Sequence, residues 1–308
     1  MSKPKVVVIC GPTASGKTAL GIEVAKAYNG EIISADSMQI YKEMDIGTAK
    51  VTKDEMQGIK HYLIDFIKPD ERYTVSDFKK DSLVAIQEIL NNKKMPIIVG
   101  GTGLYVNSLI YEINFQEMNF DEEYRKMLMN EAEDEAKLEE LWNKANDIDP
   151  EAMAKISKND KKRIIRVLEI YKATGKNKTE QEKNSRKKDL IYDYYVFGIN
   201  YDRDKLYERI NYRVDKMIEA GLIDEVKKIL SKYDKFPTAM QGLGYKEVVR
   251  YLEGEYSKEE MIVKIKQETR RYAKRQMTWF RKNKDIIWLN GEANIDENID
   301  IICNTVNN

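Results

Sequence analysis

Short apolar runs alternate with longer amphipathic stretches along the first hundred residues of the chain. Residues 6–10 form a run of β-branched and small apolar side chains, which is typical of a strand buried on both faces. Shorter apolar runs at residues 31–34, 62–65 and 95–99 are separated by segments with apolar positions at helical spacing. Strands that alternate with helices in this way predict an α/β fold built on a doubly wound parallel sheet, with the strand ends along one edge.

The pattern changes near residue 116, where helical periodicity continues without a strand signal. Residues 116–150 contain 12 acidic and 4 basic side chains, the bias is reversed in residues 157–188, and a strand pattern returns at 194–199. Apolar periodicity then predicts helices at about 203–219, 222–233, 244–253 and 258–283. We therefore predict a core formed by residues 1–115 and 191–308, a small all-helical insertion domain at 116–190, and a helical C-terminal part.

Composition narrows the class of protein. The 308 residues include 52 basic and 52 acidic side chains, so net charge by itself indicates no partner. No apolar run approaches the roughly 20 residues that span a bilayer, and two Cys with one His cannot form a zinc finger. We expect a monomeric, cytoplasmic protein with no membrane contact and no structural metal.

The first strand leads into a Gly-x-x-x-x-Gly-Lys-Thr motif that is followed by helical spacing. A strand, a glycine loop and a helix in this order form the phosphate-binding P-loop, in which backbone N–H groups and the helix N-terminus face an anion. Lys17 is expected to reach the outer phosphate and Thr18 to ligate Mg²⁺. A chance glycine loop is the alternative. The predicted phosphate site consists of Gly11, Pro12, Thr13, Ala14, Ser15, Gly16, Lys17 and Thr18.

Two other strand ends carry polar side chains. Asp36 follows the second strand, and Thr102 lies in a glycine-flanked turn after residues 95–99. Ligands of open α/β sheets bind outside the carboxyl ends of the strands, so both residues fall where chemistry is expected. The structural alternatives are a loop cap for Asp36 and a turn-stabilising hydroxyl for Thr102.

The last long helix is strongly basic. Residues 264–284 contain Glu268 as their single acid and interleave Tyr272, Trp279 and Phe280 with Lys and Arg. Basic and aromatic side chains together suit a nucleic-acid backbone with stacked bases. A solvated helix face with aromatics in the core is the alternative.

Eight motifs occur in an order that resembles one enzyme family. The chain is similar over nearly its whole length to the tRNA dimethylallyltransferases (tRNA isopentenyltransferases) of the bacterial type. The motifs that carry the resemblance lie at residues 11–18, 34–41, 45–50, 61–65, 100–105, 159–166, 242–247 and 270–281.

The resemblance implies transfer of a dimethylallyl group from dimethylallyl diphosphate to the exocyclic amine of the adenine 3′-adjacent to the anticodon, with release of diphosphate. It implies that the anticodon stem-loop is gripped between the core and the insertion, and that Arg213 clamps the diphosphate opposite Lys17. Asp36 is then expected to act as the base, with Thr102 beside the amine. The residues expected to bind tRNA are Asp36, Ser37, Met38, Gln39, Thr102, Arg125, Asn159, Asp160, Lys161, Lys162, Arg163, Gly244, Tyr245, Lys274, Arg275, Gln276, Trp279 and Arg281.

Three other functions share part of the pattern. A P-loop kinase of a nucleoside or small metabolite would have the same glycine loop, but it leaves the basic helix and the insertion unexplained. Enzymes that prenylate free adenosine phosphates are expected to lack the insertion. An RNA-binding module switched by a nucleotide would bind tRNA without forming a covalent product.

Overall fold

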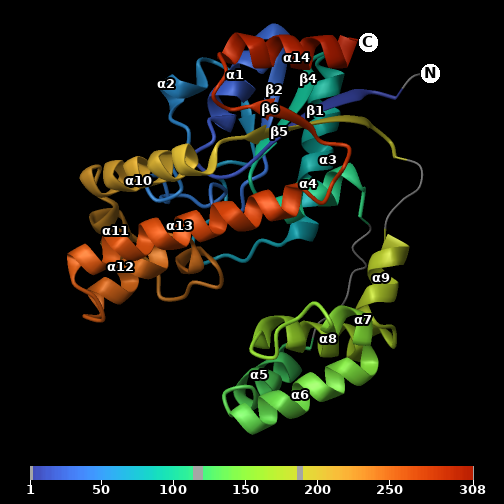
Figure 1. Ribbon diagram of the computed structural model, residues 1–308, viewed down its shortest axis with the longest axis vertical. Helices are drawn as coiled ribbons and strands as arrows, with labels where there is room; N and C mark the ends of the chain where they lie inside the picture. The colour runs from blue at the N-terminus through green and yellow to red at the C-terminus, as the bar shows by residue number, and fades with distance from the viewer. Residues whose placement is uncertain (1–2, 114–120, 186–189, 308) are drawn as a thin grey trace. The chain divides into compact units, whose positions relative to one another are not determined.

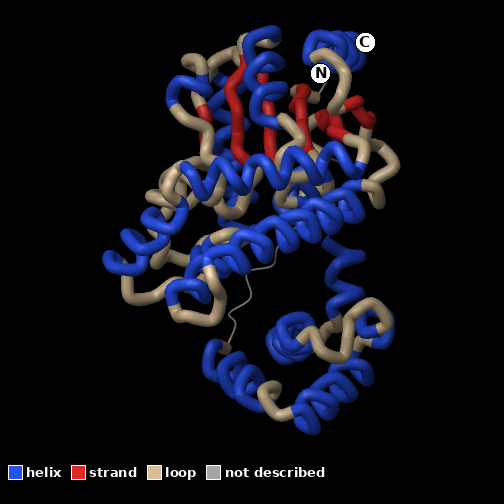
Figure 2. Tube along the Cα trace, turned by 60° about the vertical axis from the view of Figure 1, so that its left-hand side comes forward, coloured by secondary structure: helices blue, strands red, loops and turns tan. Residues whose placement is uncertain are grey.

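The computed structural model describes residues 3–113, 121–185 and 190–307, and its strands form one parallel sheet (Figures 1 and 2). Six strands lie in the order β3-β2-β4-β1-β5-β6, and every neighbouring pair is parallel. The predicted α/β class is therefore confirmed. The strands are β1 (Lys5–Cys10), β2 (Gly30–Ser34), β3 (His61–Tyr62), β4 (Met95–Gly100), β5 (Asp193–Asn200) and β6 (Ile287–Asn290).

Helices cover both faces of the sheet because buried strand residues point alternately to each side. On one face, Val7 and Ile9 of β1 pack in a core with α1 (Lys17–Ala27) and α14 (Ile295–Asn307). The helices α3 (Val75–Asn91) and α4 (Gly103–Ile110) contact the sheet through β1, β2 and β4. All strand C-termini consequently point to one edge, where the loops after β1, β2 and β4 meet.

The strand predicted at 62–65 is too long, and the sequence analysis did not predict several elements, among them the last strand and the last helix. Leu63 and Asp65 have φ angles of 58° and 57°, so the chain turns out of the sheet directly after Tyr62. Neither β6 nor α14 was predicted. Three of the four residues of β6 are exposed, so that strand lacks the continuous apolar run of the inner strands.

A layer of helices extends beyond the strand C-termini. It contains α10 (Arg203–Glu219), α11 (Leu222–Lys232), α12 (Tyr245–Leu252) and α13 (Lys258–Phe280), which pack with Ile40, Tyr41 and Met44 in a second core. These bounds agree with the predicted helices to within three residues. Two short helices, α2 (Lys53–Met56) and the 3-10 helix Ala239–Gln241, complete this part of the chain.

The chain divides into two compact units, residues 1–110 with 190–308, and residues 111–189. The second unit contains helices only, in its described residues, and has its own apolar core around Leu141 and Leu168. The predicted boundary at residue 116 lies outside the described residues. No helix in the described ranges is both long and apolar enough to cross a membrane. The helices of this unit are α5 (Glu122–Glu131), α6 (Glu135–Ile148), α7 (Pro150–Met153), α8 (Lys161–Thr174) and α9 (Lys178–Ser185).

Candidate active site

The glycine loop after β1 turns back on itself before α1 begins. Gly16 caps α1 with a φ of 82°, in the left-handed region that glycine occupies without strain. The Lys17 ammonium lies inside this turn and donates a 2.6 Å hydrogen bond to the Pro12 carbonyl. Burial, with a smaller contribution from the nearby Arg213, lowers the pKa of Lys17 to about 8, and the Asp36 carboxylate opposes this fall. The loop therefore holds a cation that lacks a full counter-charge.

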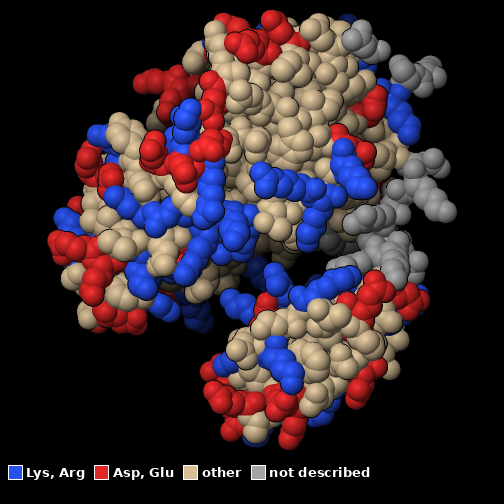
Figure 3. Space-filling view, viewed as in Figure 1, with Lys and Arg blue, Asp and Glu red and all other residues tan. Residues whose placement is uncertain are grey.

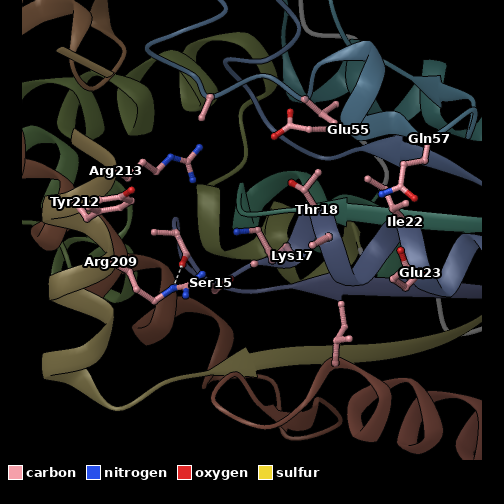
Figure 4. Close-up of a pocket in the computed structure, with 16 residues that line it drawn as sticks. Ser15, Lys17, Thr18, Ile22, Glu23, Glu55, Gln57, Arg209, Tyr212 and Arg213 are labelled. Atoms are coloured by element: carbon pink, nitrogen blue, oxygen red, sulfur yellow. Dashed lines mark hydrogen bonds between the residues drawn. The ribbon is translucent and has the colours of Figure 1, made fainter. Parts of the chain in front are cut away.

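A cavity of about 690 Å³ opens in front of this loop, and we call it the phosphate-loop cavity (Figure 4). Lys17 and Thr18 enter it from α1, while Arg209 and Arg213 enter it from α10. Arg209 donates a 2.8 Å hydrogen bond from Nε to the Ala14 carbonyl, and Arg213 is buried deeply enough for its pKa to be lowered. Three cations thus face one space, which suits a polyanion.

Arg209 was not predicted, although the sequence contained a signal for it. Residues 209 and 213 are four positions apart on one helix, so they lie on the same face. Once Arg213 was expected to bind phosphate, the helical spacing alone pointed to Arg209.

The predicted Mg²⁺ ligand, Thr18, is exposed to the phosphate-loop cavity. Among the described residues, no cluster of three or more His, Cys, Asp or Glu side chains could hold a metal ion by itself. Mg²⁺ commonly binds proteins through one or two ligands and completes its shell with water and substrate phosphates. The single hydroxyl beside a phosphate loop fits that mode of binding.

Asp36 lies at the end of β2 and its two carboxylate oxygens differ. Oδ1 accepts hydrogen bonds from the backbone N–H groups of Met38 (2.9 Å) and Gln39 (3.3 Å), as the loop-cap alternative anticipated. Oδ2 accepts no hydrogen bond within the described part of the chain. One oxygen therefore fixes the side chain while the other remains available to accept a proton.

Thr102 lies directly beside this turn. Its hydroxyl oxygen accepts a hydrogen bond from the Ser37 N–H (3.0 Å) and donates to the Ser37 hydroxyl (3.3 Å). Its own N–H donates to the Ala35 carbonyl at 3.2 Å. This close approach requires a glycine at position 100, because a Cβ there would lie 2.2 Å from the Ala35 oxygen. The turns after β2 and β4 are thereby joined.

The turn after β2 lines a second cavity of about 300 Å³, which we call the Asp36 cavity; Thr102 holds this turn from behind and does not itself line the cavity. Asp36, Ser37 and Met38 contribute one wall, and the opposite wall includes Tyr272 and Arg275 of α13. Burial raises the pKa of the Tyr272 phenol to about 12, so it remains a neutral hydrogen-bonding group. Arg213 lines both cavities, so the two spaces adjoin at its guanidinium.

A loop between the two cavities is held by Glu225 of α11, which the sequence analysis missed. The Glu225 carboxylate accepts hydrogen bonds from the N–H groups of Asp45 (2.9 Å), Ile46 (2.7 Å) and Gly47 (3.1 Å). It also accepts one from the Tyr245 hydroxyl at 2.6 Å. Tyr245 is buried, and a Cβ at Gly47 would lie 2.4 Å from its ring. No local sequence pattern indicates the contact between Glu225 and the 45–47 turn, because these residues lie about 180 positions apart.

Two residues expected to bind RNA are engaged inside the protein instead. The Gln39 amide donates to the carbonyls of Thr48 and Ala49, both at 3.2 Å, and Gln39 does not line the Asp36 cavity. Gln276 is 6% exposed, and both ends of its amide are hydrogen-bonded within the core. The amides of both residues are thus engaged by the protein itself, and their contact with tRNA stays a prediction.

Four other predicted RNA-binding residues of the first unit, on α13 or directly after it, are exposed, whereas Gly244 is buried. Lys274 and Arg275 are exposed on α13, and Lys and Arg side chains gather over this helix in the space-filling view (Figure 3). Trp279 is 38% exposed and packs on Gly103. Arg281 donates to the Asn200 side chain at 3.3 Å. Gly244, the N-cap of α12, lines the Asp36 cavity.

The predicted basic surface of the second unit surrounds the start of α8. Asp160 caps this helix by accepting from the Arg163 N–H, while Lys162 and Arg163 are exposed, as is Asn159. Lys161 pairs with Glu133 at 3.0 Å. Arg125 donates to both oxygens of the buried Glu169, at 3.0 and 3.1 Å, so its charge already neutralises a carboxylate. Contact of these residues with tRNA stays a prediction.

Comparison with known proteins identifies similar chains. A family model described as IPP transferase matches residues 39–283. A tRNA dimethylallyltransferase of Acetivibrio thermocellus is 54% identical over 96% of this chain and 94% of its own length. The crystal structure of a tRNA isopentenylpyrophosphate transferase from Bacillus halodurans is 42% identical, with a TM-score of 0.75 over 99% of this chain and 96% of that one. A eukaryotic dimethylallyltransferase, crystallised while acting on tRNA, is 32% identical, with a TM-score of 0.76 over 94% of this chain and 74% of that one.

Proposed function

The chain belongs to the IPP transferase family and is a prenyltransferase that acts on tRNA, and we propose how its two cavities divide the reaction. The donor is dimethylallyl diphosphate, bound in the phosphate-loop cavity. The acceptor is the exocyclic amine of the adenine 3′-adjacent to the anticodon, presented in the Asp36 cavity. The observation that carries the proposal is that Arg213 lines both spaces, with Lys17 on one side and Asp36 on the other.

The phosphate-loop cavity supplies the stabilisation that a diphosphate leaving group needs. When the bond between the allylic carbon and the diphosphate oxygen breaks, negative charge develops on that oxygen. Lys17, Arg209 and Arg213 lie around the cavity and can neutralise it. Each hydrogen-bonding cation of this kind typically lowers the activation free energy by about 3–4 kcal/mol. Thr18 would hold a Mg²⁺ ion, which supplies further charge neutralisation when bound.

The Asp36 cavity supplies the base. The adenine amine is weakly nucleophilic because its lone pair is delocalised into the ring, and it becomes acidic as the new nitrogen–carbon bond forms. Asp36 Oδ2 can accept that proton, while Oδ1 keeps the side chain oriented through its two backbone hydrogen bonds. The Thr102 hydroxyl, which holds the Ser37 backbone, is proposed to bond the amine or a phosphate oxygen when the substrates are present.

The flipped adenine reaches this cavity only after leaving the anticodon-loop stack, which costs a few kcal/mol. The exposed cations of α13 are suited to bind phosphates on either side of the extruded nucleotide. Tyr272 lines the same cavity and offers an aromatic ring to the base.

The experiment that tests the proposal is mass spectrometry of unmodified tRNA after incubation with the protein, Mg²⁺ and dimethylallyl diphosphate. We expect one added five-carbon unit on the adenine next to the anticodon, and equimolar release of diphosphate. A parallel reaction with labelled ATP and a nucleoside tests the kinase alternative. Transfer of phosphate without transfer of the prenyl group would contradict the proposal.

A further inference from the structure

Gln276 is the one polar residue among the buried residues of α13. Its neighbours on the inner face of the helix are Ala273, Met277 and Phe280, all of them buried. Burying a primary amide is unfavourable unless both its donor and its acceptor find partners. A leucine or methionine would fill the same volume without that requirement, so the amide has a function other than packing.

The two ends of the Gln276 amide bind two different turns of the active site. Oε1 accepts a hydrogen bond from the Thr13 N–H in the phosphate loop at 2.9 Å. Nε2 donates to the Gly101 carbonyl, in the turn that carries Thr102, at 2.8 Å. A Cβ at position 101 would lie 2.4 Å from Nε2, so the bridge forms because that residue is a glycine. One side chain therefore spans the gap between the two turns.

The bridge continues into the Asp36 cavity. The residue after Gly101 is Thr102, whose hydroxyl holds the Ser37 backbone next to Asp36. Tyr272, one turn earlier on α13, lines the cavity and contacts the side chains of Thr102 and Gln276. A hydrogen-bonded path thus runs from the phosphate loop through Gln276 to the turn beside the base.

We propose that Gln276 is a positioning residue for the transfer step, one that fixes the separation between the phosphate loop and the Thr102 turn. The inference rests on the proposed function, in which the first turn holds the leaving diphosphate and the second faces the attacking amine. Gln276 itself contacts neither substrate. Its effect arises because a displacement of about 1 Å between reacting groups can lower a rate by about 10²-fold.

The test compares two isosteric replacements of buried amides, Gln276→Met and Asn298→Leu. Asn298 of α14 is also 6% exposed and donates to a backbone carbonyl, that of Asn290 at 2.9 Å, but it lines neither cavity. Both substitutions remove one buried amide and leave its partners unpaired. Single-turnover prenyl transfer is measured with both substrates saturating, at a temperature where circular dichroism shows each variant folded. Affinities for tRNA and for inorganic diphosphate are measured in parallel.

We expect Gln276→Met to lower the single-turnover rate at least tenfold while both affinities stay within about threefold. Asn298→Leu should keep the rate within twofold of that of the unsubstituted protein, even if its melting temperature falls as far as that of Gln276→Met. A Gln276→Met rate within twofold of the unsubstituted protein would overturn the inference. An equal rate loss in Asn298→Leu would overturn it as well, because loss of stability would then explain both.

A second variant covers the case in which Gln276→Met does not fold. Gln276→Glu keeps the shape and the acceptor for Thr13, but it sets a carboxylate against the Gly101 carbonyl. We expect it to lose at least tenfold in the same rate, and an unchanged rate in folded Gln276→Glu would contradict the bridge. Absence of prenylated tRNA with the unsubstituted protein would instead refute the proposed function, and this inference would fall with it.

Discussion

The two cavities adjoin at Arg213 but are built in different ways. The phosphate-loop cavity is the larger, about 690 against 300 Å³, and much of it comes from one continuous segment that includes residues 14–19. The Asp36 cavity draws its walls from the turns after β1 and β2, from the loop at 47–48, and from α10, α12 and α13. Binding of a phosphate group needs backbone N–H groups and cations, which one loop can supply. An adenine has to be enclosed, which requires several elements.

The two cavities also differ in the charged and polar groups that line them. Burial disfavours the charged forms of Lys17 and Arg213 beside the phosphate-loop cavity, since the pKa values of both are lowered. These groups regain favourable interactions when an anion enters. The Asp36 cavity instead contains a carboxylate oriented by backbone N–H groups and a phenol kept neutral by burial. The first cavity is suited to stabilise charge, and the second to accept a proton.

The largest effect should come from the base of the Asp36 cavity. Asp36→Asn retains the shape of the side chain and can still accept the backbone hydrogen bonds, but it cannot take a proton. We expect the single-turnover rate to fall by about 10²–10⁴-fold with little change in the affinity for either substrate. Quench-flow measurement of prenylated tRNA tests this. Asp70→Asn, at an exposed position, serves as the control. A near-normal rate in Asp36→Asn would remove Asp36 as the base.

Removal of the Lys17 ammonium should have the next largest effect, and this effect should appear in the use of dimethylallyl diphosphate. Lys17→Ala is expected to lower kcat/KM for dimethylallyl diphosphate by about 10²–10³-fold, because the leaving oxygens lose a charged donor. The affinity for tRNA should stay within threefold, as judged by filter binding. Lys26→Ala, on the exposed side of the same helix, is the matched control. Loss of tRNA binding in Lys17→Ala would argue against the division of labour between the cavities.

The loop between the cavities tests whether they depend on each other. Glu225→Gln replaces a carboxylate that accepts four hydrogen bonds, so the 45–47 turn loses its anchor. Thr48 follows that turn, and its carbonyl accepts from the side chains of Gln39 (3.2 Å) and Arg213 (3.5 Å). We expect kcat to fall roughly 10–100-fold through misplacement of Arg213. Asp224→Asn makes the same charge change one residue away, at an exposed position, and should leave steady-state kinetics unchanged.

The pH dependence of donor binding should distinguish the two cavities further. The pKa of Lys17 is lowered to about 8, so the free protein loses this cation as pH rises above 8. The value of kcat/KM for dimethylallyl diphosphate should then fall about tenfold per pH unit, while the affinity for tRNA is unaffected. Lys17→Arg carries a cation that does not titrate in this range, and its profile should remain flat above pH 8. A flat profile in the unsubstituted protein would contradict the assignment.

The smallest effect is expected at the outer surface of α13. Replacing Lys274 and Arg275 with Ala should weaken tRNA binding several-fold. Arg275 also lines the Asp36 cavity, so only Lys274→Ala by itself is expected to leave the rate at saturation unchanged. Because binding to phosphates releases counterions, the log–log salt slope should decrease by roughly 0.7–0.9 for each phosphate that is no longer neutralised. Fluorescence anisotropy over a salt series measures this slope. The control removes Lys26 and Lys60, two exposed lysines elsewhere on the first unit. An unchanged slope would mean that this face of α13 does not meet the RNA.

The sequence determined those features whose cause lies within a few neighbouring residues. The glycine loop at 11–18, the strand that precedes it and the bounds of α10 and α13 follow from local dihedral preferences and apolar spacing. Asp36 and Thr102 could be singled out because each directly follows a buried strand, and parallel strands end at one edge of a sheet.

The tertiary structure decided which polar side chains line a cavity and which hold the protein together. Gln39 and Gln276 belong to motifs that the sequence analysis associated with RNA, yet the Gln39 amide binds the backbone of the loop nine residues further on, and the Gln276 amide binds a turn 175 positions away. The Thr13–Gln276 hydrogen bond joins residues 263 positions apart, and Glu225 meets the 45–47 turn across 178 to 180 positions. The physical reason is that an amide or a carboxylate has the same local preferences in either role. Its hydrogen-bond partners are set by which segments the folded chain brings within about 3 Å, and nothing in the neighbouring residues records that.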